Sequence, residues 1–200
     1  MRNHNATSHG NVADRKRLGL GVLVSLLLVF TWLSLPAMAT TNQGDRSDDW
    51  VWWKPVGKAS LTWGFWKIYD SELRSPSGKF EPASGDPLAL VITYNRDIDA
   101  EDLLEATVEQ WEHLGFTENQ IKNWLPQMSG VWPDVREGDR LIYVLSNDRG
   151  RFFYQPLQGN AQPTGALDNA DIANAFSAIW LSPATAYPSL RLALIGGNPE

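Results

Sequence analysis

Basic and phenolic side chains stand near the ends of two apolar segments of this chain. Lys67 interrupts the first segment shortly before Tyr69, and Tyr94 closes the second one with Arg96 two residues on. A positive side chain beside a phenol at the end of a buried strand can bind a carboxylate through charge-assisted hydrogen bonds. An exposed strand end explains the same pattern, so the sequence leaves a ligand clamp and a solvated end both open.

The chain offers little for nucleophilic, metal or cofactor chemistry. It has no cysteine, and beyond residue 39 its only histidine is His113. His113 falls at the predicted end of a helix, where a positive side chain favours the helix dipole, so we expect no Ser-His-Asp triad. One histidine cannot build a histidine-rich metal site, and residues 134–139 lack the spacing of a calcium loop. No glycine-rich nucleotide motif opens a helix after a strand. We predict no catalytic, metal or cofactor residues.

Tryptophan is abundant, with nine copies after residue 39. Five occupy apolar positions of predicted elements, where core packing is the expected role: Trp63, Trp66, Trp111, Trp124 and Trp180. Trp50, Trp52 and Trp53 instead cluster before a Lys-Pro break, and they fit either a sugar-stacking or membrane-interface patch or an edge strand that covers a sheet. Residues 132–135, which begin with Trp132, are interpreted as a tight connection.

Period-two alternation predicts the strands that position these residues. Residues 60–69 and 88–94 each alternate as one strand, the second buried on both faces. Residues 141–145 and 151–157 flank an Asn-Asp-Arg-Gly turn and are predicted to form a hairpin.

Helix-start signals predict the remaining elements. Asp99, with Asp102 three residues on, and Asp168 are placed as N-caps, and Thr117 with Gln120 makes a capping box. The first helix ends at Gly115. The third carries an apolar stripe over residues 172–180, and a short helix is predicted at residues 188–195. Helices grouped after runs of strands predict an α+β domain with a largely antiparallel sheet.

The N-terminal part of the chain carries an export signal. A basic cluster at residues 15–17 precedes the apolar run 18–35, and residues 36–39 (Pro-Ala-Met-Ala) supply a small-x-small cleavage pattern. We predict that residues 1–39 are a signal peptide or, if uncleaved, a membrane anchor at residues 18–35, because spans need about 17–25 residues. Either form places the protein in the periplasm or another extracytoplasmic space. Residues 40–49 are predicted to be a flexible linker and residues 50–198 the folded domain.

The exported part is acidic. Removing the leader's four basic and one acidic residue from the totals of 17 and 23 leaves 13 and 22, a net charge of −9. Such a domain is not expected to bind nucleic acid. Because it lacks cysteine, its stability must come from packing rather than disulfides.

Four segments together resemble bacterial chalcone isomerase-like proteins. They are residues 65–70 (Phe-Trp-Lys-Ile-Tyr-Asp), 110–115 (Gln-Trp-Glu-His-Leu-Gly), 132–135 (Trp-Pro-Asp-Val) and 179–185 (Ile-Trp-Leu-Ser-Pro-Ala-Thr). In that family a long antiparallel sheet is covered by helices as an open-faced sandwich. The resemblance therefore implies the same α+β class as the element order.

The resemblance also implies that plant-type catalysis is absent. Plant enzymes of this fold close a chalcone to a flavanone with five polar side chains: arginine, threonine, tyrosine, lysine and asparagine. The aligned tyrosine, lysine, asparagine and threonine positions here hold Asp99, Asp102, Ala106 and Gly64, and the arginine's nearest substitute is Lys54 or Lys58. Two acids in place of a phenol and an ammonium would repel an anionic chalcone.

Other members of the fold are non-catalytic fatty-acid binders that hold the carboxylate on an arginine and a tyrosine. On that resemblance we predict an exported, non-enzymatic domain that binds a small apolar ligand, such as a fatty acid, in the cleft between sheet and helices. The predicted ligand-binding residues are Lys58, Lys67, Tyr69, Tyr94 and Arg96. A solid core without a cavity is the opposing interpretation.

Two further functions stay open. An isomerase or lyase would use Asp99 or Asp102 as a base, which requires that carboxylate to face a pocket. An interaction module would use the cluster from Trp50 to Trp53 on a partner or a membrane surface.

Overall fold

The computed structural model describes residues 47–82 and 84–197, which belong to the unit Gln43–Glu200. The predicted leader and most of the predicted linker lie outside the described residues. In the described part of the chain, no helix combines the length and the apolar character needed to cross a bilayer.

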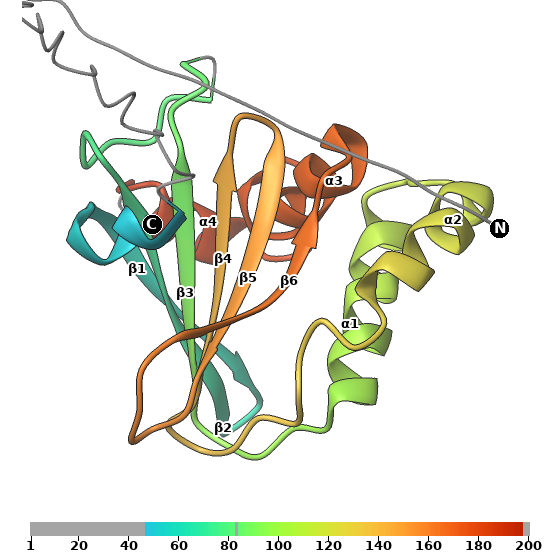
Figure 1. The fold of residues 1–200 in the computed structure, drawn as a ribbon, viewed down its shortest axis with the longest axis horizontal. Helices are drawn as coiled ribbons and strands as arrows, with labels where there is room; N and C mark the ends of the chain where they lie inside the picture. The colour runs from blue at the N-terminus through green and yellow to red at the C-terminus, as the bar shows by residue number, and fades with distance from the viewer. Residues whose placement is uncertain (1–46, 83, 198–200) are drawn as a thin grey trace, which may run out of the picture. The chain divides into compact units, whose positions relative to one another are not determined.

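Six antiparallel strands form one sheet, in the order in which they follow along the chain (Figure 1). They are β1 (Lys54–Trp63), β2 (Trp66–Ser75), β3 (Leu88–Tyr94), β4 (Arg140–Ser146), β5 (Arg149–Gln155) and β6 (Gln162–Leu167). The predicted hairpin of β4 and β5 is confirmed, with a tighter turn in which Asn147 and Asp148 both have positive φ. Strand β6 was not predicted, because Pro163 and Gly165 hide its pattern.

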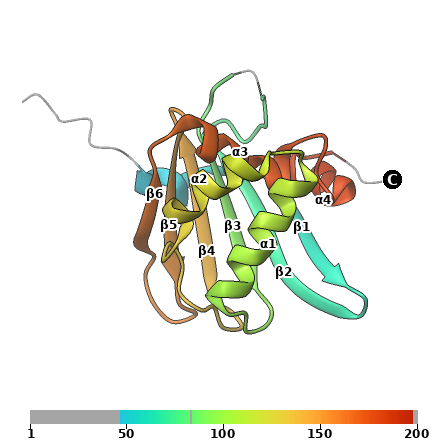
Figure 2. The same cartoon turned by 90° about the vertical axis from the view of Figure 1, so that its right-hand side faces the viewer.

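Four α-helices lie on one side of the sheet, and a short 3-10 helix lies on the other (Figure 2). They are α1 (Ala100–His113), α2 (Glu118–Met128), α3 (Ala170–Leu181), α4 (Pro188–Leu194) and the 3-10 helix η1 (Ser47–Trp52). The capping box at the start of α2 is confirmed, with the Gln120 N–H donating to Thr117 Oγ1. An α+β fold with an antiparallel sheet covered by helices is therefore confirmed.

Two predicted helix caps are wrong. Asp99 occupies the N-cap position of α1, but its side chain makes no cap hydrogen bond, and Asp134 Oδ1 accepts from the Ala100 N–H at 2.9 Å instead. Helix α3 is capped by Asn169 rather than by Asp168, since Asn169 Oδ1 accepts from the Asp171 N–H at 2.8 Å. In the first case the cap comes from a residue 34 positions away, which local spacing cannot reveal.

The segment 60–69 is not one strand, as predicted, but the closed end of the β1–β2 hairpin. Gly64 has a φ of +60° and forms a two-residue turn with Phe65, which pairs Trp63 with Trp66. Glycine at the first central position is typical of such tight hairpin turns. Because the alternation of aromatic residues continues through this turn, the sequence pattern does not reveal the turn. The prediction that Trp63 and Trp66 belong to the core is wrong, because they are 80% and 70% exposed.

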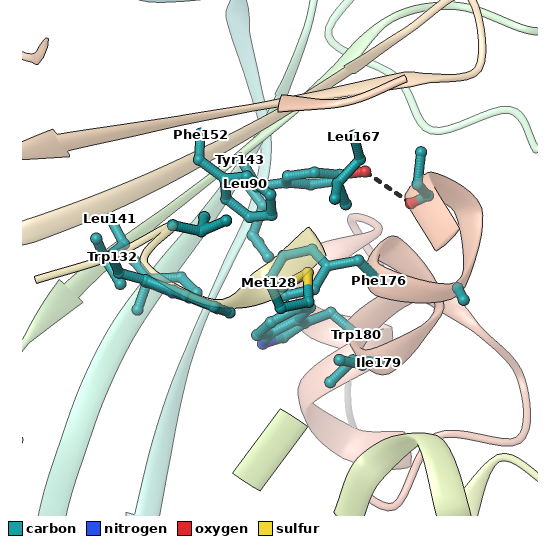
Figure 3. Packing of buried hydrophobic residues seen from close by; sticks show 14 of the residues in the cluster. Leu90, Met128, Trp132, Leu141, Tyr143, Phe152, Leu167, Phe176, Ile179 and Trp180 are labelled. Carbon is teal, nitrogen blue, oxygen red and sulfur yellow. Dashed lines mark hydrogen bonds between the residues drawn. The ribbon is translucent and has the colours of Figure 1, made fainter. Parts of the chain in front are cut away.

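The sheet divides the core into two clusters. The larger lies between the sheet and the α-helices, with Phe176 of α3 among Tyr143, Phe152 and Trp180 (Figure 3). Ring centroids there are 4.7–5.3 Å apart. The smaller cluster lies on the opposite face, where Trp50 of η1 covers apolar residues of β3, β4 and β5.

Helix α4, the last element that the structure describes, packs on β1, the first described strand. Gly57 of β1 makes this possible, because a Cβ atom there would overlap the carbonyl oxygen of Ala193. Any larger residue at position 57 would push α4 off the sheet.

Candidate ligand-binding cavity

An apolar cavity of about 180 Å³ lies between the sheet and helices α1 and α3. Ile92 of β3 and Phe152 of β5 contribute to the sheet side, and Leu103 of α1 and Ile179 of α3 to the helix side. An engineered apolar cavity of about 150 Å³ stays dry and binds benzene. The cavity in this protein is therefore large enough for a compact apolar molecule.

Three tyrosine side chains from neighbouring strands line the cavity. The Tyr69 hydroxyl accepts a hydrogen bond from Trp180 Nε1 at 3.0 Å. The Tyr143 hydroxyl donates to the carbonyl oxygen of Ala173 on α3 at 2.6 Å, the dashed line in Figure 3. The Tyr94 hydroxyl makes no hydrogen bond to any residue that the structure describes. Tyr94 thus brings a polar group to the cavity that a ligand can use.

Burial keeps these phenols neutral. It raises the pKa of Tyr69 to about 12, although the hydrogen bond from Trp180 acts in the opposite direction. Burial also raises the pKa of Tyr94 and of Tyr143 well above the ordinary value near 10. All three side chains therefore keep their protons at any physiological pH.

Helix α1 adds further polar groups to the cavity wall. Thr107 and Gln110 both line it, and the Thr107 hydroxyl donates to the Leu103 carbonyl oxygen at 2.8 Å. Gln110 Oε1 is buried and has no hydrogen-bond partner among the described residues. An unsatisfied buried acceptor costs about 1–3 kcal/mol. A ligand or a water that donates a hydrogen bond to Gln110 would remove that cost.

Charge is sparse around the cavity. Asp102 lines it from an exposed position on α1, whereas Asp99 does not line it. No lysine, arginine or histidine contributes to the lining in the described part of the chain. Within the same part, no group of histidine and acidic side chains is placed to hold a metal ion. The cavity is therefore suited to binding neutral molecules.

The structure brings two of the five predicted ligand-binding residues together. Tyr69 and Tyr94 line the cavity with ring centroids 6.1 Å apart. Lys58, Lys67 and Arg96 do not line it. Lys58 Nζ pairs with a Glu72 carboxylate oxygen at 2.8 Å, Lys67 Nζ pairs with Asp70 at 2.6 Å, and Arg96 is exposed after β3.

Sequence reasoning missed several cavity residues. Trp132, which we interpreted only as part of a tight connection, is buried, and its ring lies 5.6 Å from that of Phe152. Gln110 lies three residues after Thr107 and seven after Leu103. This spacing puts Gln110 on the side of α1 that faces the sheet. A polar residue among the sheet-facing residues of a helix was the signal that could have identified Gln110.

The predicted tryptophan cluster is not a single surface. Trp50 is buried against Phe153, and Trp53 is half-buried beside the smaller core cluster. Only Trp52 among the three is strongly exposed, at 85%. Trp50 and Trp52 lie in a 3-10 helix that ends just before Trp53, so the predicted edge strand is wrong. A binding patch made of all three rings is therefore wrong.

Comparisons with known proteins leave the ligand open. No protein-family model matches the chain. An uncharacterised protein of Haemophilus influenzae is 28% identical over 144 residues, which cover 72% of this chain and 68% of that protein. A crystal structure of an Arabidopsis thaliana fatty-acid binding protein aligns with a TM-score of 0.49 and 6% identity, over 71% of this chain and 86% of the other.

Proposed function

We propose that this domain is an exported, non-enzymatic, chalcone isomerase-like protein that binds a small apolar ligand between its sheet and its helices. The observation that carries the proposal is the cavity of about 180 Å³, whose wall is apolar apart from a few hydrogen-bonding groups. A solid core would have no space for a ligand, whereas a concave, mostly apolar wall with a few polar groups is the chemistry of small-molecule sites.

The cavity favours a compact ligand with a neutral head group. Tyr69 and Tyr94 offer neutral hydroxyls, and Gln110 offers an unpartnered acceptor. An anionic head would find no basic side chain there, and it would meet the carboxylate of Asp102 at the rim. The volume is close to that of a cavity that holds benzene, so a long acyl chain would need extra space. Among fatty acids, we expect short ones to bind, in their protonated form.

The first experiment identifies small molecules that co-purify with the protein, by mass spectrometry after denaturation. A second measurement compares 1-hexanol with hexanoate by calorimetric titration at pH 7, because the two share a carbon chain and differ in head-group charge. We expect hexanol to bind at least tenfold more tightly. Equal or tighter binding of hexanoate would contradict the neutral-head proposal. An empty protein that takes up neither compound would refute ligand binding altogether.

A pair of variants locates the binding site. Ala106→Phe places a ring at the cavity wall from an exposed position of α1, where the fold does not depend on alanine. Glu105→Phe adds the same ring one residue away, at an exposed position that does not line the cavity. We expect the first variant to lose hexanol binding at least tenfold and the second to retain it. Equal hexanol affinities of the two variants would show that the ligand binds in another part of the protein.

A further inference from the structure

The end of the β1–β2 hairpin carries three exposed aromatic side chains within four residues. Trp63 is 80% exposed, Trp66 is 70% exposed, and Phe65 at the turn is fully exposed. We call these three residues the aromatic tip. The hairpin end lies clear of the helices in Figure 2. Exposed aromatic rings gathered in this way on a protein surface mark an interaction site.

The aromatic tip is continuous with the cavity. Trp63 follows Leu61, a cavity residue, by two positions on β1, so both side chains lie on the helix-covered face of the sheet. Trp66 pairs directly with Trp63 across the hairpin and shares that face. Ile68 is the extra residue of a bulge in β2, lies between Trp66 and Tyr69 along the strand, and also lines the cavity. One apolar surface therefore runs from the cavity wall to the tip.

We propose that the aromatic tip docks on a lipid bilayer and that the ligand passes between bilayer and cavity along this surface. The passage of ligand rests on the proposed function, but the docking does not. Tryptophan prefers the membrane interface, where its ring is apolar and its N–H remains hydrated. Residues 18–35 of the same chain form the apolar run that the sequence predicts to direct the protein to or through a membrane.

A second copy of the chain fits the tip less well than a bilayer does. One aromatic side chain buries about 150–250 Å², so three provide less than the roughly 800 Å² per partner of a standard interface. A bilayer needs no complementary surface. The net charge of −9 beyond residue 39 opposes docking on anionic lipid, so the proposed surface is zwitterionic.

The test uses the full chain with phosphatidylcholine vesicles whose acyl chains are either plain or brominated, since bromine quenches indoles that enter the bilayer. All proteins carry Trp32→Phe, so that the predicted leader contributes no signal. The double variant Trp63→Phe with Trp66→Phe removes the tip indoles and keeps aromatic rings. Trp52→Phe is the matched control, because it removes one strongly exposed indole elsewhere.

We expect bromine to quench the Trp32→Phe parent and the Trp52→Phe control to the same extent, and the tip double variant less than half as much. Replacing half of the lipid by phosphatidylglycerol should weaken quenching of the parent. The cavity variant Ala106→Phe should be quenched like the parent, which separates failure of docking from failure of ligand binding. Equal quenching of the tip double variant and the parent would overturn the proposal. So would a dimer in lipid-free sedimentation that disappears in the triple variant W63A/F65A/W66A.

Discussion

The two faces of one sheet use polar groups in opposite ways. On the helix-covered face, Tyr69 and Tyr94 are buried and neutral beside an apolar cavity. On the other face, Lys58 and Glu72 pair across β1 and β2, and Arg74 Nε donates to Glu72 at 2.5 Å. Period-two alternation therefore sorts charge from hydroxyl within the same strands. A basic residue in an apolar strand is no evidence for a ligand clamp until the face on which it lies is known.

On the sheet face away from the α-helices, the charged side chains form ion pairs and hydrogen bonds with one another. Burial alone would raise the pKa of Glu72, but hydrogen bonds from Lys58 and Arg74 outweigh burial and lower it. The same balance holds for Asp70, whose pKa is lowered by Lys67, Ser60 and Asn95 against the effect of burial. Stability from these carboxylates is therefore lost in acid, whereas stability from the buried phenols is lost in alkali.

The largest expected contrast between the two faces is in packing. Phe176→Ala empties the centre of the larger cluster and should lower the free energy of unfolding by about 4 kcal/mol. Trp50→Ala removes the cover of the smaller cluster, where η1 can shift to compensate, and should cost about 2 kcal/mol. Urea denaturation of both variants measures the difference. Equal losses would show that the two clusters contribute alike.

Alkaline pH should weaken the cavity face selectively. The folded pKa of Tyr69 is about 12 against an unfolded value near 10. Its contribution to stability is therefore complete below pH 10 and declines as the pH rises toward 12, by up to about 3 kcal/mol. Tyr94 and Tyr143 act in the same direction. Thermal unfolding from pH 8 to pH 12 tests this, and a constant midpoint would contradict the buried neutral phenols.

Hydroxyl deletions separate ligand binding from stability within the cavity. Tyr143→Phe removes the hydrogen bond from the hydroxyl to the Ala173 carbonyl oxygen and should cost about 0.5–1.5 kcal/mol of unfolding free energy. Tyr94→Phe removes no hydrogen bond to the described residues, so stability should hold while hexanol binding falls by about 1 kcal/mol, roughly fivefold. The comparison fails if Tyr94→Phe destabilises the protein as much as Tyr143→Phe does.

The smallest effect is expected on the charged face. Lys58→Ala removes an ion pair whose lysine is exposed, and Glu72 keeps Arg74 as its partner, so we expect a loss of about 0–1 kcal/mol. Hexanol and hexanoate affinities should both stay unchanged, because Lys58 does not line the cavity. Calorimetric titration of this variant against the parent provides the check. A selective loss of hexanoate binding would restore Lys58 as a carboxylate ligand.

Local patterns predicted most of the fold. Alternation located β3 and the β4–β5 hairpin, and the Thr117 capping box located α2. The turn at Gly64 escaped because apolar residues surround it on both sides.

The candidate site was only partly predictable for a related reason. Tyr69 and Tyr94, which were singled out at the ends of apolar segments, do line the cavity, but Gln110 becomes a cavity residue only once α1 is packed on the sheet. Lys58 and Lys67 lie on the opposite face of β1 and β2, and Arg96 lies beyond the end of β3, so none of them lines the cavity; residue type alone does not predict these positions.

The contact of α4 with β1 bears on how the chain reaches its final state. Gly57 contacts Ala193 at the end of α4, 136 residues later in the sequence, so packing of β1 is completed only when α4 is in place. Contacts between such distant segments slow folding, because a long loop must close before they form. A nascent chain therefore lacks this closure until the residues of α4 have been released, and it exposes part of its core to chaperones until then.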